Sequence, residues 1–421
     1  MARQKINPRR VPLPDQALLD LVQRQTLTYF WDFAHPVSGM ARERSNPVPG
    51  YDYLETVTTG GTGFGIMALL AGVARGFLPR ADVRDRLRQI TGFLTRAETY
   101  HGVFPHFLHG ATAATIAFSE KDDGGDLVET SFLMMGLLCA RQFFSRLDAA
   151  EVDLRNAIDR LWHAVEWKWH TSGREALYWH WSSRYGWDMD HAITGWNECL
   201  ITYLLAASSP TYPIAPTVYH RGWTSGDTFR NGQSYYGVTL PLGPSHGGPL
   251  FFSHFSFLGL DPRGLRDRYA DYWEQNRAHT LINRAHCIAN PSDFAGYAAN
   301  CWGLTACDGD AGYGAFCPRH DRGVIAPTAA LSAIAYTPAE SMLVLRHLYD
   351  DLGERTWSRY GFIDAFNLSR NWFASSNLAI DQAPIIIMIE NHRSGLLWDL
   401  FMSCDEVRFA LRELGFERQG R

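Results

Sequence analysis

Residues 121–138 read KDDGGDLVETSFLMMGLL and join a charged loop to a long apolar segment. The segment from about residue 126 to 144 has almost no polar face, which predicts a helix that is buried on most sides. Two carboxylates, Asp126 and Glu129, stand three residues apart at its start. Their Cβ atoms would therefore lie roughly 5–6 Å apart on one helix face.

Two acids at the start of a buried helix have two interpretations. They could cap the helix, because carboxylates in the first turn accept hydrogen bonds from free N–H groups and complement the helix dipole. They could instead face a substrate, and Gly124 and Gly125 would then let the ligand approach the backbone closely. We favour the second interpretation because of these glycines.

Two more acids adjoin apolar segments. Glu198 falls within a helix predicted over 191–207, where burial would raise its pKa and keep it protonated, as a general acid requires. The alternative is a structural Glu198 that bonds to a neighbouring Arg or amide. Asp381 stands at the head of another apolar helix, predicted over 376–393.

Composition narrows the class of protein. The chain has 421 residues, 46% of them apolar and 20% charged, with 14 Trp, 18 Tyr and 24 Phe. A large core is therefore expected, with aromatic rings left over as flat platforms for sugars. A net charge of −5 without a basic stripe argues against nucleic acid and anionic membranes as partners. The longest apolar stretches, 63–74 and 383–389, are too short to span a bilayer.

The N-terminus and the cysteines bear on the compartment. The first 14 residues are basic and rich in Pro but lack the apolar core of a signal peptide. The sequence as written thus predicts a cytoplasmic protein with an extended segment over 1–14, or a periplasmic protein if the N-terminus is a processed one. Seven Cys is an odd number, so no disulfide framework is expected, although two of Cys301, Cys307 and Cys317 could pair.

Aromatic residues gather in two stretches. Trp167-Lys-Trp169 and Tyr178-Trp-His-Trp181 flank Ser172-Gly-Arg174, which predicts a β-hairpin that either covers the core or floors a sugar site. Residues 289–324 form a long loop rich in Gly, Asp and aromatic side chains. We predict seven substrate-binding residues, which lie in these two stretches or beside the acids: Asp123, Trp181, Trp196, Asn197, Trp302, Asp308 and Tyr313.

No metal or organic cofactor is predicted. His101, His106 and His109 share one loop, but no Cys or acid completes a metal site at ligand spacing. Residues 58–65, TTGGTGFG, resemble a phosphate loop only superficially, since no Lys-Ser/Thr follows and no strand is expected before them. Close packing of helices at the rim of a pocket explains these glycines better.

The pattern of elements predicts an all-α fold. We expect about eleven or twelve helices, long loops, few strands, and no interdomain linker that would divide residues 1–421. The long connections favour a closed ring of helices with its loops, and the small β-hairpin, at one end. A bundle is disfavoured because its helices are joined by short loops.

Four motifs resemble those of one family, glycoside hydrolase family 144. They are KDDGGDLVET (121–130), GWNECLITY (195–203), YADYWE (269–274) and AIDQAP (379–384), within a similarity that runs from about residue 18 to 416. The resemblance implies a single catalytic (α/α)6 toroid that hydrolyses β-1,2-glucans with inversion and without a cofactor, as an endo-glucanase or by releasing sophorose. The family's acidic site positions fall on Asp126, Glu129, Glu198 and Asp381.

An inverting glycosidase holds a protonated and an ionised carboxyl roughly 6.5–9.5 Å apart. Asp126 and Glu129 would be too close to face each other across a sugar, so we predict Glu198 as the acid. The base is Asp126, Glu129 or Asp381, acting directly or through a substrate hydroxyl. The alternatives are a transglycosylating or cyclising enzyme, an α-glucan hydrolase of glucoamylase type, and a non-catalytic glucan-binding protein. Endo or exo action and the choice of monomer or dimer stay open.

Overall fold

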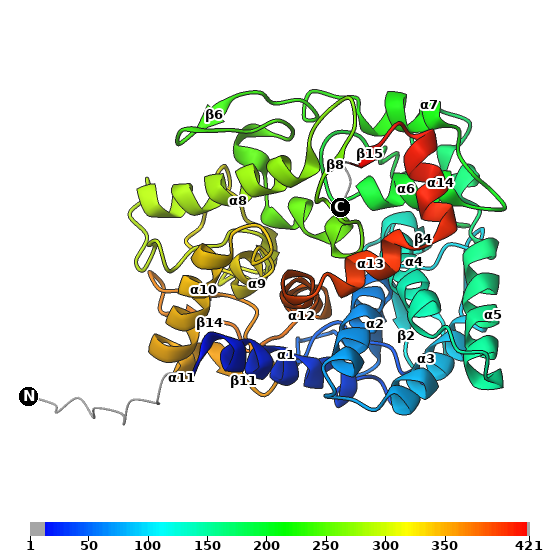
Figure 1. Ribbon diagram of the computed structural model, residues 1–421, viewed down its shortest axis with the longest axis horizontal. Coiled ribbons are helices and arrows are strands. Elements are labelled where there is room, and N and C mark those ends of the chain that lie inside the picture. The colour runs from blue at the N-terminus through cyan, green and yellow to red at the C-terminus, as the bar shows by residue number, and fades with distance from the viewer. Residues whose placement is uncertain (1–12, 419–421) are drawn as a thin grey trace, which may run out of the picture.

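The computed structural model describes residues 13–418, so the segment predicted over 1–14 lies outside the described residues apart from its last two positions. Helices dominate the chain (Figure 1). They are α1 (Asp15–Trp31), α2 (Thr59–Ala74), α3 (Arg80–Leu94), α4 (Leu127–Phe143), α5 (Ala149–Ala164), α6 (Leu200–Ser208), α7 (Pro216–Val218), α8 (Tyr272–Ala289), α9 (Pro327–Leu331), α10 (Pro338–Arg346), α11 (Gly353–Thr356), α12 (Ala379–Arg393), α13 (Leu396–Met402) and α14 (Asp405–Glu413).

The inner helices pack side by side around a ring. Helix α2 packs against α4 and α12, α4 packs against α6, and α12 packs against α9. The 3-10 turn over Phe255–Leu258 packs against both α6 and α12, and the turn over Leu250–Ser253 packs against α8. An outer layer covers this ring, with α1 on α2 and α12, α3 and α5 beside α2 and α4, and α10 on α9. Figure 1 shows α12 end-on near the centre of the molecule. The predicted all-α toroid is confirmed.

Glycines set the closest helix contact of the ring. A Cβ atom on Gly63 of α2 would lie 2.2 Å from the carbonyl oxygen of Phe132 in α4. A Cβ atom on Gly136 of α4 would lie 2.1 Å from the carbonyl oxygen of Gly63. Only a residue without a side chain fits at these two positions, so the glycines of residues 58–65 are helix-packing residues, as the sequence predicted.

All strands are short and lie in the loops. They are β1 (Thr56–Thr58), β2 (Phe107–His109), β3 (Thr115–Ile116), β4 (Gly125–Asp126), β5 (His180–Trp181), β6 (Ser234–Tyr235), β7 (Val238–Thr239), β8 (Leu265–Arg266), β9 (Ala306–Cys307), β10 (Gly314–Ala315), β11 (Trp357–Ser358), β12 (Gly361–Phe362), β13 (Phe366–Asn367), β14 (Trp372–Phe373) and β15 (Glu417–Arg418). Strands β1, β2 and β3 form one antiparallel sheet, and the others pair in twos.

The prediction of a β-hairpin around Ser172 is wrong. Residues Trp167–Thr171 form a 3-10 turn, η1, because the Trp167 ring is buried against Trp162. Strand β5 pairs instead with β4, where Gly125 faces Trp181 and Asp126 faces His180. A Cβ on Gly124 would lie 2.3 Å from the carbonyl oxygen of Trp181. This glycine therefore serves the pairing of two strands rather than the approach of a ligand.

One predicted helix begins later than expected. Helix α6 starts at Leu200 rather than near residue 191, because Gly195 has φ +81° and Asn197 Oδ1 accepts a hydrogen bond from the backbone N–H of Cys199. Helix α8 begins at Tyr272, where the Asp271 side chain caps it. All seven cysteines are unpaired, so the pairing considered among Cys301, Cys307 and Cys317 does not form.

A single large hydrophobic cluster fills the ring and the space between its two layers. Six Trp side chains are fully buried in the molecule: Trp162, Trp167, Trp196, Trp223, Trp302 and Trp398. Within residues 13–418, no helix is both long and apolar enough to cross a membrane.

Candidate active site

A cavity of about 1030 Å³ opens at one end of the helical ring. Aromatic rings form much of its wall, among them Tyr51, Phe118, Phe132, Trp179, Tyr313 and Trp372. Carboxylates line it at Glu43, Asp52, Glu129, Glu198 and Asp308. Flat apolar faces beside carboxylates are the surface that a sugar with apolar ring faces and hydroxyl edges requires.

The four predicted catalytic acids all lie at the N-terminal ends of inner helices. Asp126 is the N-cap of α4 and Glu129 lies in its first turn. Glu198 lies two residues before α6, and Asp381 lies in the first turn of α12. Free N–H groups at these ends favour negative charge, and the ring geometry brings the ends together.

Glu198 has the environment of a general acid. Its side chain is 8% exposed and lines the cavity. Burial, reinforced by the nearby charges of Glu129 and Asp126, raises its pKa to about 7. Within residues 13–418, no other side chain hydrogen-bonds its carboxyl group. Its backbone is fixed by Ser256, whose hydroxyl donates to the Glu198 carbonyl oxygen and accepts from the N–H of Ile201 in α6.

Glu129 is the second acid on the cavity wall. Its Oε2 atom accepts a hydrogen bond of 2.7 Å from the backbone N–H of Gly60, in the first turn of α2. Burial raises the pKa of this carboxyl, and the charge of Asp126 raises it further, while the charge of His106 opposes the shift.

Asp126 is fully engaged by protein groups. One carboxyl oxygen accepts the N–H groups of Val128 and Glu129, at 3.0 and 2.9 Å. The other accepts from His106 Nδ1 at 2.9 Å and from Trp179 Nε1 at 3.2 Å. Its side chain is fully buried and does not line the cavity. Asp126 therefore positions His106 and Trp179, two residues of the cavity wall, and caps α4.

His106 is held as a cation by its neighbours. Burial disfavours the charged ring, but the charge of Glu129 and the hydrogen bond with Asp126 outweigh it and raise the pKa of His106 to about 9. The imidazole also stacks on the exposed Phe118 ring, with centroids 4.3 Å apart. His106 was considered only as a metal ligand in the sequence. Its partner Asp126, twenty residues further along the chain, could not be assigned from spacing.

Asp381 lies beneath the cavity wall beside Asp364. Both carboxyls are almost fully buried, and Leu378 and Ile380, which precede Asp381 in the chain, line the cavity in its place. The backbone N–H of Asp308 donates to Asp364 at 2.7 Å. Burial and the charge of Asp308 raise the pKa of Asp364 to about 8, while burial and the charge of Asp364 raise the pKa of Asp381 well above its ordinary range.

A charged cluster borders this pair. Arg44 forms ion pairs with Glu43 at 2.8 Å and with Asp308 at 3.3 Å. The Tyr51 hydroxyl donates to Glu43 and the Ser376 hydroxyl donates to Asp308. Glu43, Arg44 and Asp364 were absent from the sequence prediction, because residues 42–54 carry no motif and Asp364 stands in a short loop.

The predicted substrate-binding residues divide into two groups. Asp308 and Tyr313 line the cavity, and Tyr313 is 57% exposed. Trp196 and Trp302 do not, because both rings are buried in the core, where Trp196 packs among Trp223, Phe257 and Tyr272. A ring buried in this way offers no face to a ligand, so the structure does not support Trp196 and Trp302 as substrate-binding residues.

Three further predicted contacts lie away from the cavity wall. Asn197 accepts hydrogen bonds from the Cys199 N–H and from Trp223 Nε1, and it shapes the turn before α6. Asp123 is half-buried in the loop before β4. Trp181 packs against His101 and Trp169, whereas Trp179, two residues earlier, takes the position on the cavity wall.

The three histidines that were predicted not to form a metal site each pair with a different acidic residue. His101 bonds to Glu166 at 3.0 Å, His106 to Asp126, and His109 lies 3.6 Å from Glu55. Within residues 13–418, one group has metal-like spacing: single ligand atoms of His106, Asp122 and Asp126 lie within 4.8 Å of one another. The Asp126 carboxylate already accepts four hydrogen bonds, which accounts for the cluster without an ion.

Paired helices closed into a toroid, with a carboxyl of raised pKa and further acids at its open end, place the chain among the glycoside hydrolases of the helical-toroid class. A family model described as "Putative glucoamylase" matches residues 190–405. A solved structure from Bacteroides uniformis, described in the same words, has a TM-score of 0.95 at 55% identity, covering 97% of this chain and 99% of that one.

Two relatives have more specific names. An endo-β-1,2-glucanase from Chitinophaga pinensis, solved with sophorotriose and glucose, is 50% identical, with a TM-score of 0.94 over 96% of this chain and 99% of that one. An exo-β-1,2-glucooligosaccharide sophorohydrolase from Parabacteroides distasonis is 44% identical over 98% of this chain. The chain spans 59% of the length of that relative. The chain belongs to the same family as these relatives, glycoside hydrolase family 144.

Proposed function

We propose that this chain is an inverting hydrolase of β-1,2-linked glucans in which Glu198 is the general acid. One observation carries the proposal: Glu198 lines the cavity and its pKa is raised to about 7. Within residues 13–418, no other side chain hydrogen-bonds its carboxyl group. The linkage is supported by the activities named for the relatives from Chitinophaga pinensis and Parabacteroides distasonis, of 50% and 44% identity. Within residues 13–418, one large hydrophobic cluster accounts for nearly all of the core, which supports one catalytic domain.

Cleavage needs one proton donor and one proton acceptor. Glu198 donates its proton to the glycosidic oxygen as the bond to the anomeric carbon breaks, which releases the leaving sugar as an alcohol. A water molecule attacks the anomeric carbon from the opposite face and loses a proton to the base, so the configuration inverts. Glu198 regains a proton from solvent before the next turnover.

We infer two candidates for the base. Glu129 lines the cavity and can accept a proton directly from an attacking water. Asp381 lies behind the wall, so it would have to accept the proton as an ionised carboxylate through an intervening water or substrate hydroxyl. Asp126 is set aside as the base because four hydrogen-bond donors already occupy its carboxylate.

The direct test is product analysis. The purified chain is incubated with linear β-1,2-glucan and, in parallel, with an α-1,4-glucan, and the products are resolved by chromatography. Release of β-1,2-oligosaccharides supports the proposal, and sophorose as the sole early product assigns exo action, whereas a ladder assigns endo action. Cleavage of the α-glucan alone, or cyclic products from the β-glucan, would contradict hydrolysis of β-1,2-glucan.

A further inference from the structure

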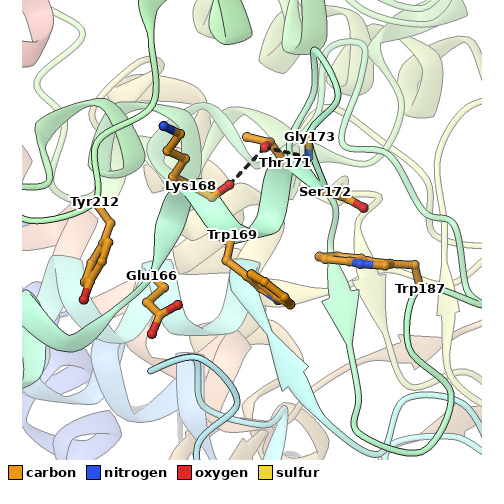
Figure 2. Close-up of a pocket in the computed structure, with 8 residues that line it drawn as sticks. All are labelled: Glu166, Lys168, Trp169, Thr171, Ser172, Gly173, Trp187 and Tyr212. Atoms are coloured by element: carbon orange, nitrogen blue, oxygen red, sulfur yellow. Dashed lines mark hydrogen bonds between the residues drawn. The ribbon is translucent and has the colours of Figure 1, made fainter.

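A second pocket, of about 500 Å³, lies on the surface apart from the catalytic cavity, and the two share no lining residue. Three aromatic rings border it, those of Trp169, Trp187 and Tyr212. Figure 2 shows Trp169 at the centre of the pocket, with Trp187 on one side and Tyr212 on the other. We name it the Trp169 pocket.

The aromatic side chains of the Trp169 pocket are unusually exposed. Trp169 is 41% exposed and Tyr212 is 42% exposed, whereas six Trp of this chain are fully buried. Leaving an indole in water forfeits much of the stabilisation that its large apolar area would give in a core. Exposed aromatic rings gathered around one concavity therefore indicate a binding site rather than a packing defect.

The Trp169 ring is held in place without a ligand. It stacks on the imidazole of His101, with centroids 3.8 Å apart and ring planes 17° apart. His101 is in turn bonded to Glu166 at 3.0 Å. The backbone of turn η1 ends at Ser172 in the left-handed region, where the Ser172 N–H donates to the Trp169 carbonyl oxygen. Binding of a ligand to this ring would therefore cost little conformational entropy.

The polar groups of the pocket fit a neutral, hydroxyl-rich ligand. Lys168, Glu166 and Ser172 surround the rings, so the two charges balance and both donors and acceptors are present. A Cβ atom added to Gly173 would meet nothing within 4 Å, so the pocket is open beside this residue. Among the lining residues, all within 13–418, Glu166 is the only carboxylate, and glycoside hydrolysis needs two. The pocket can bind a sugar but lacks the groups to cleave it.

Strand β5 connects this pocket to the catalytic site. Trp181 packs against Trp169, with centroids 6.0 Å apart, while Trp179 lines the catalytic cavity and donates to Asp126. We propose that the Trp169 pocket is a second, non-catalytic saccharide-binding site, which takes another segment of the β-1,2-glucan chain cleaved in the cavity. The identity of the sugar rests on the function proposed above. A polymer held at two sites on one protein binds more tightly than at either site alone.

The test measures binding without turnover. The parent is Glu198→Gln, and the pocket variants add Trp169→Ala and Tyr212→Ala, singly and together. Phe409→Ala is the matched control, because Phe409 is an aromatic residue of α14 that is 51% exposed and outside both pockets. Dissociation constants for linear β-1,2-glucan are obtained from retardation in native gels that contain the polymer, with gels lacking it as reference.

We expect the double variant to bind the polymer at least about tenfold more weakly than the parent, and the Phe409 variant to match the parent. Tyr212→Ala alone should weaken binding in the same direction, which guards against misfolding of the Trp169 variant. A double variant that binds as tightly as the parent would overturn the proposal, and so would a parent that the polymer does not retard. Turnover of the glucan by the unmodified chain tests the proposed function separately.

Discussion

The backbone N–H of Gly60 donates a 2.7 Å hydrogen bond to the carboxylate of Glu129, across the contact between α2 and α4. A Cβ atom on Gly60 would lie 2.5 Å from the same carboxylate oxygen. Gly60 thus binds the Glu129 carboxylate through its N–H group, and its lack of a side chain leaves room for that carboxylate. The fold and the chemistry are linked here, because the close packing that forms the ring also sets the position of a cavity acid.

Gly60→Ala should therefore displace Glu129. We expect kcat on β-1,2-glucan to fall roughly 10–100-fold, the cost of misplacing a reacting group by about 1 Å. Gly92→Ala is the matched control, since Gly92 lies in α3 and a Cβ atom added there would meet nothing within 4 Å. This control should keep full activity with slightly higher stability. Equal rates for both variants would show that the position of Glu129 does not matter.

Asp126→Asn tests the assignment of Asp126 as a positioning residue. The folded pKa of His106, about 9, exceeds its ordinary 6.5, so its contribution to stability is present below about pH 6.5 and is lost as pH rises through 9. Asn removes part of that shift. The free energy of unfolding should drop more at pH 6 than at pH 9.5, and NMR titration should show a lower pKa for His106.

An unchanged His106 titration in Asp126→Asn would contradict this view of the Asp126–His106 bond. A stability loss of the same size at both pH values would point to helix capping alone, which is worth about 1 kcal/mol.

The base can be identified by rescue. Glu129→Gln and Asp381→Asn should each lower kcat by roughly 10²–10⁴-fold if the residue changed is the base. Azide added to the true base variant should restore turnover and yield a glycosyl azide of inverted configuration, because the anion attacks without needing deprotonation. The other variant should gain nothing from azide, and rescue of neither would exclude both residues as the base.

Sequence and structure agree where the signal is local. Glu129 and Asp381 were recognised because each stands at the head of a long apolar run, and the structure has them in the first turns of α4 and α12. The start of α6 was missed because the positive φ of Gly195 interrupts an apolar pattern that otherwise looks continuous. That error left Glu198 in the right region but on the wrong element.

Features that depend on contacts between residues far apart in the sequence could not be predicted. The burial of Trp302 and the exposure of Trp169 follow from tertiary packing, and both residues lie in aromatic-rich stretches of similar composition. The pairing of Asp364 with Asp381, and of His106 with Asp126, joins residues from different loops and helices. No spacing rule in the sequence connects them.

Glu198→Gln should stabilise the protein. The folded pKa of about 7 exceeds the ordinary 4.5, so the stability due to the protonated form is complete below about pH 4.5 and is lost as pH rises through 7. Gln carries no charge to bury. At pH 8 the variant should unfold with a free energy higher than that of the unmodified chain by up to about 3 kcal/mol, with little difference at pH 4.5. Lower stability at pH 8 would contradict the buried, unpaired state of Glu198.

The rate of Glu198→Gln on two substrates tests the central claim most directly. Gln keeps the shape of the side chain but cannot donate a carboxylic proton, so kcat on linear β-1,2-glucan should fall roughly 10²–10⁴-fold. A β-sophoroside with a nitrophenyl leaving group needs little protonation and should lose far less. Near-normal kcat on the natural glucan, or equal losses on both substrates, would contradict the assignment of Glu198 as the general acid.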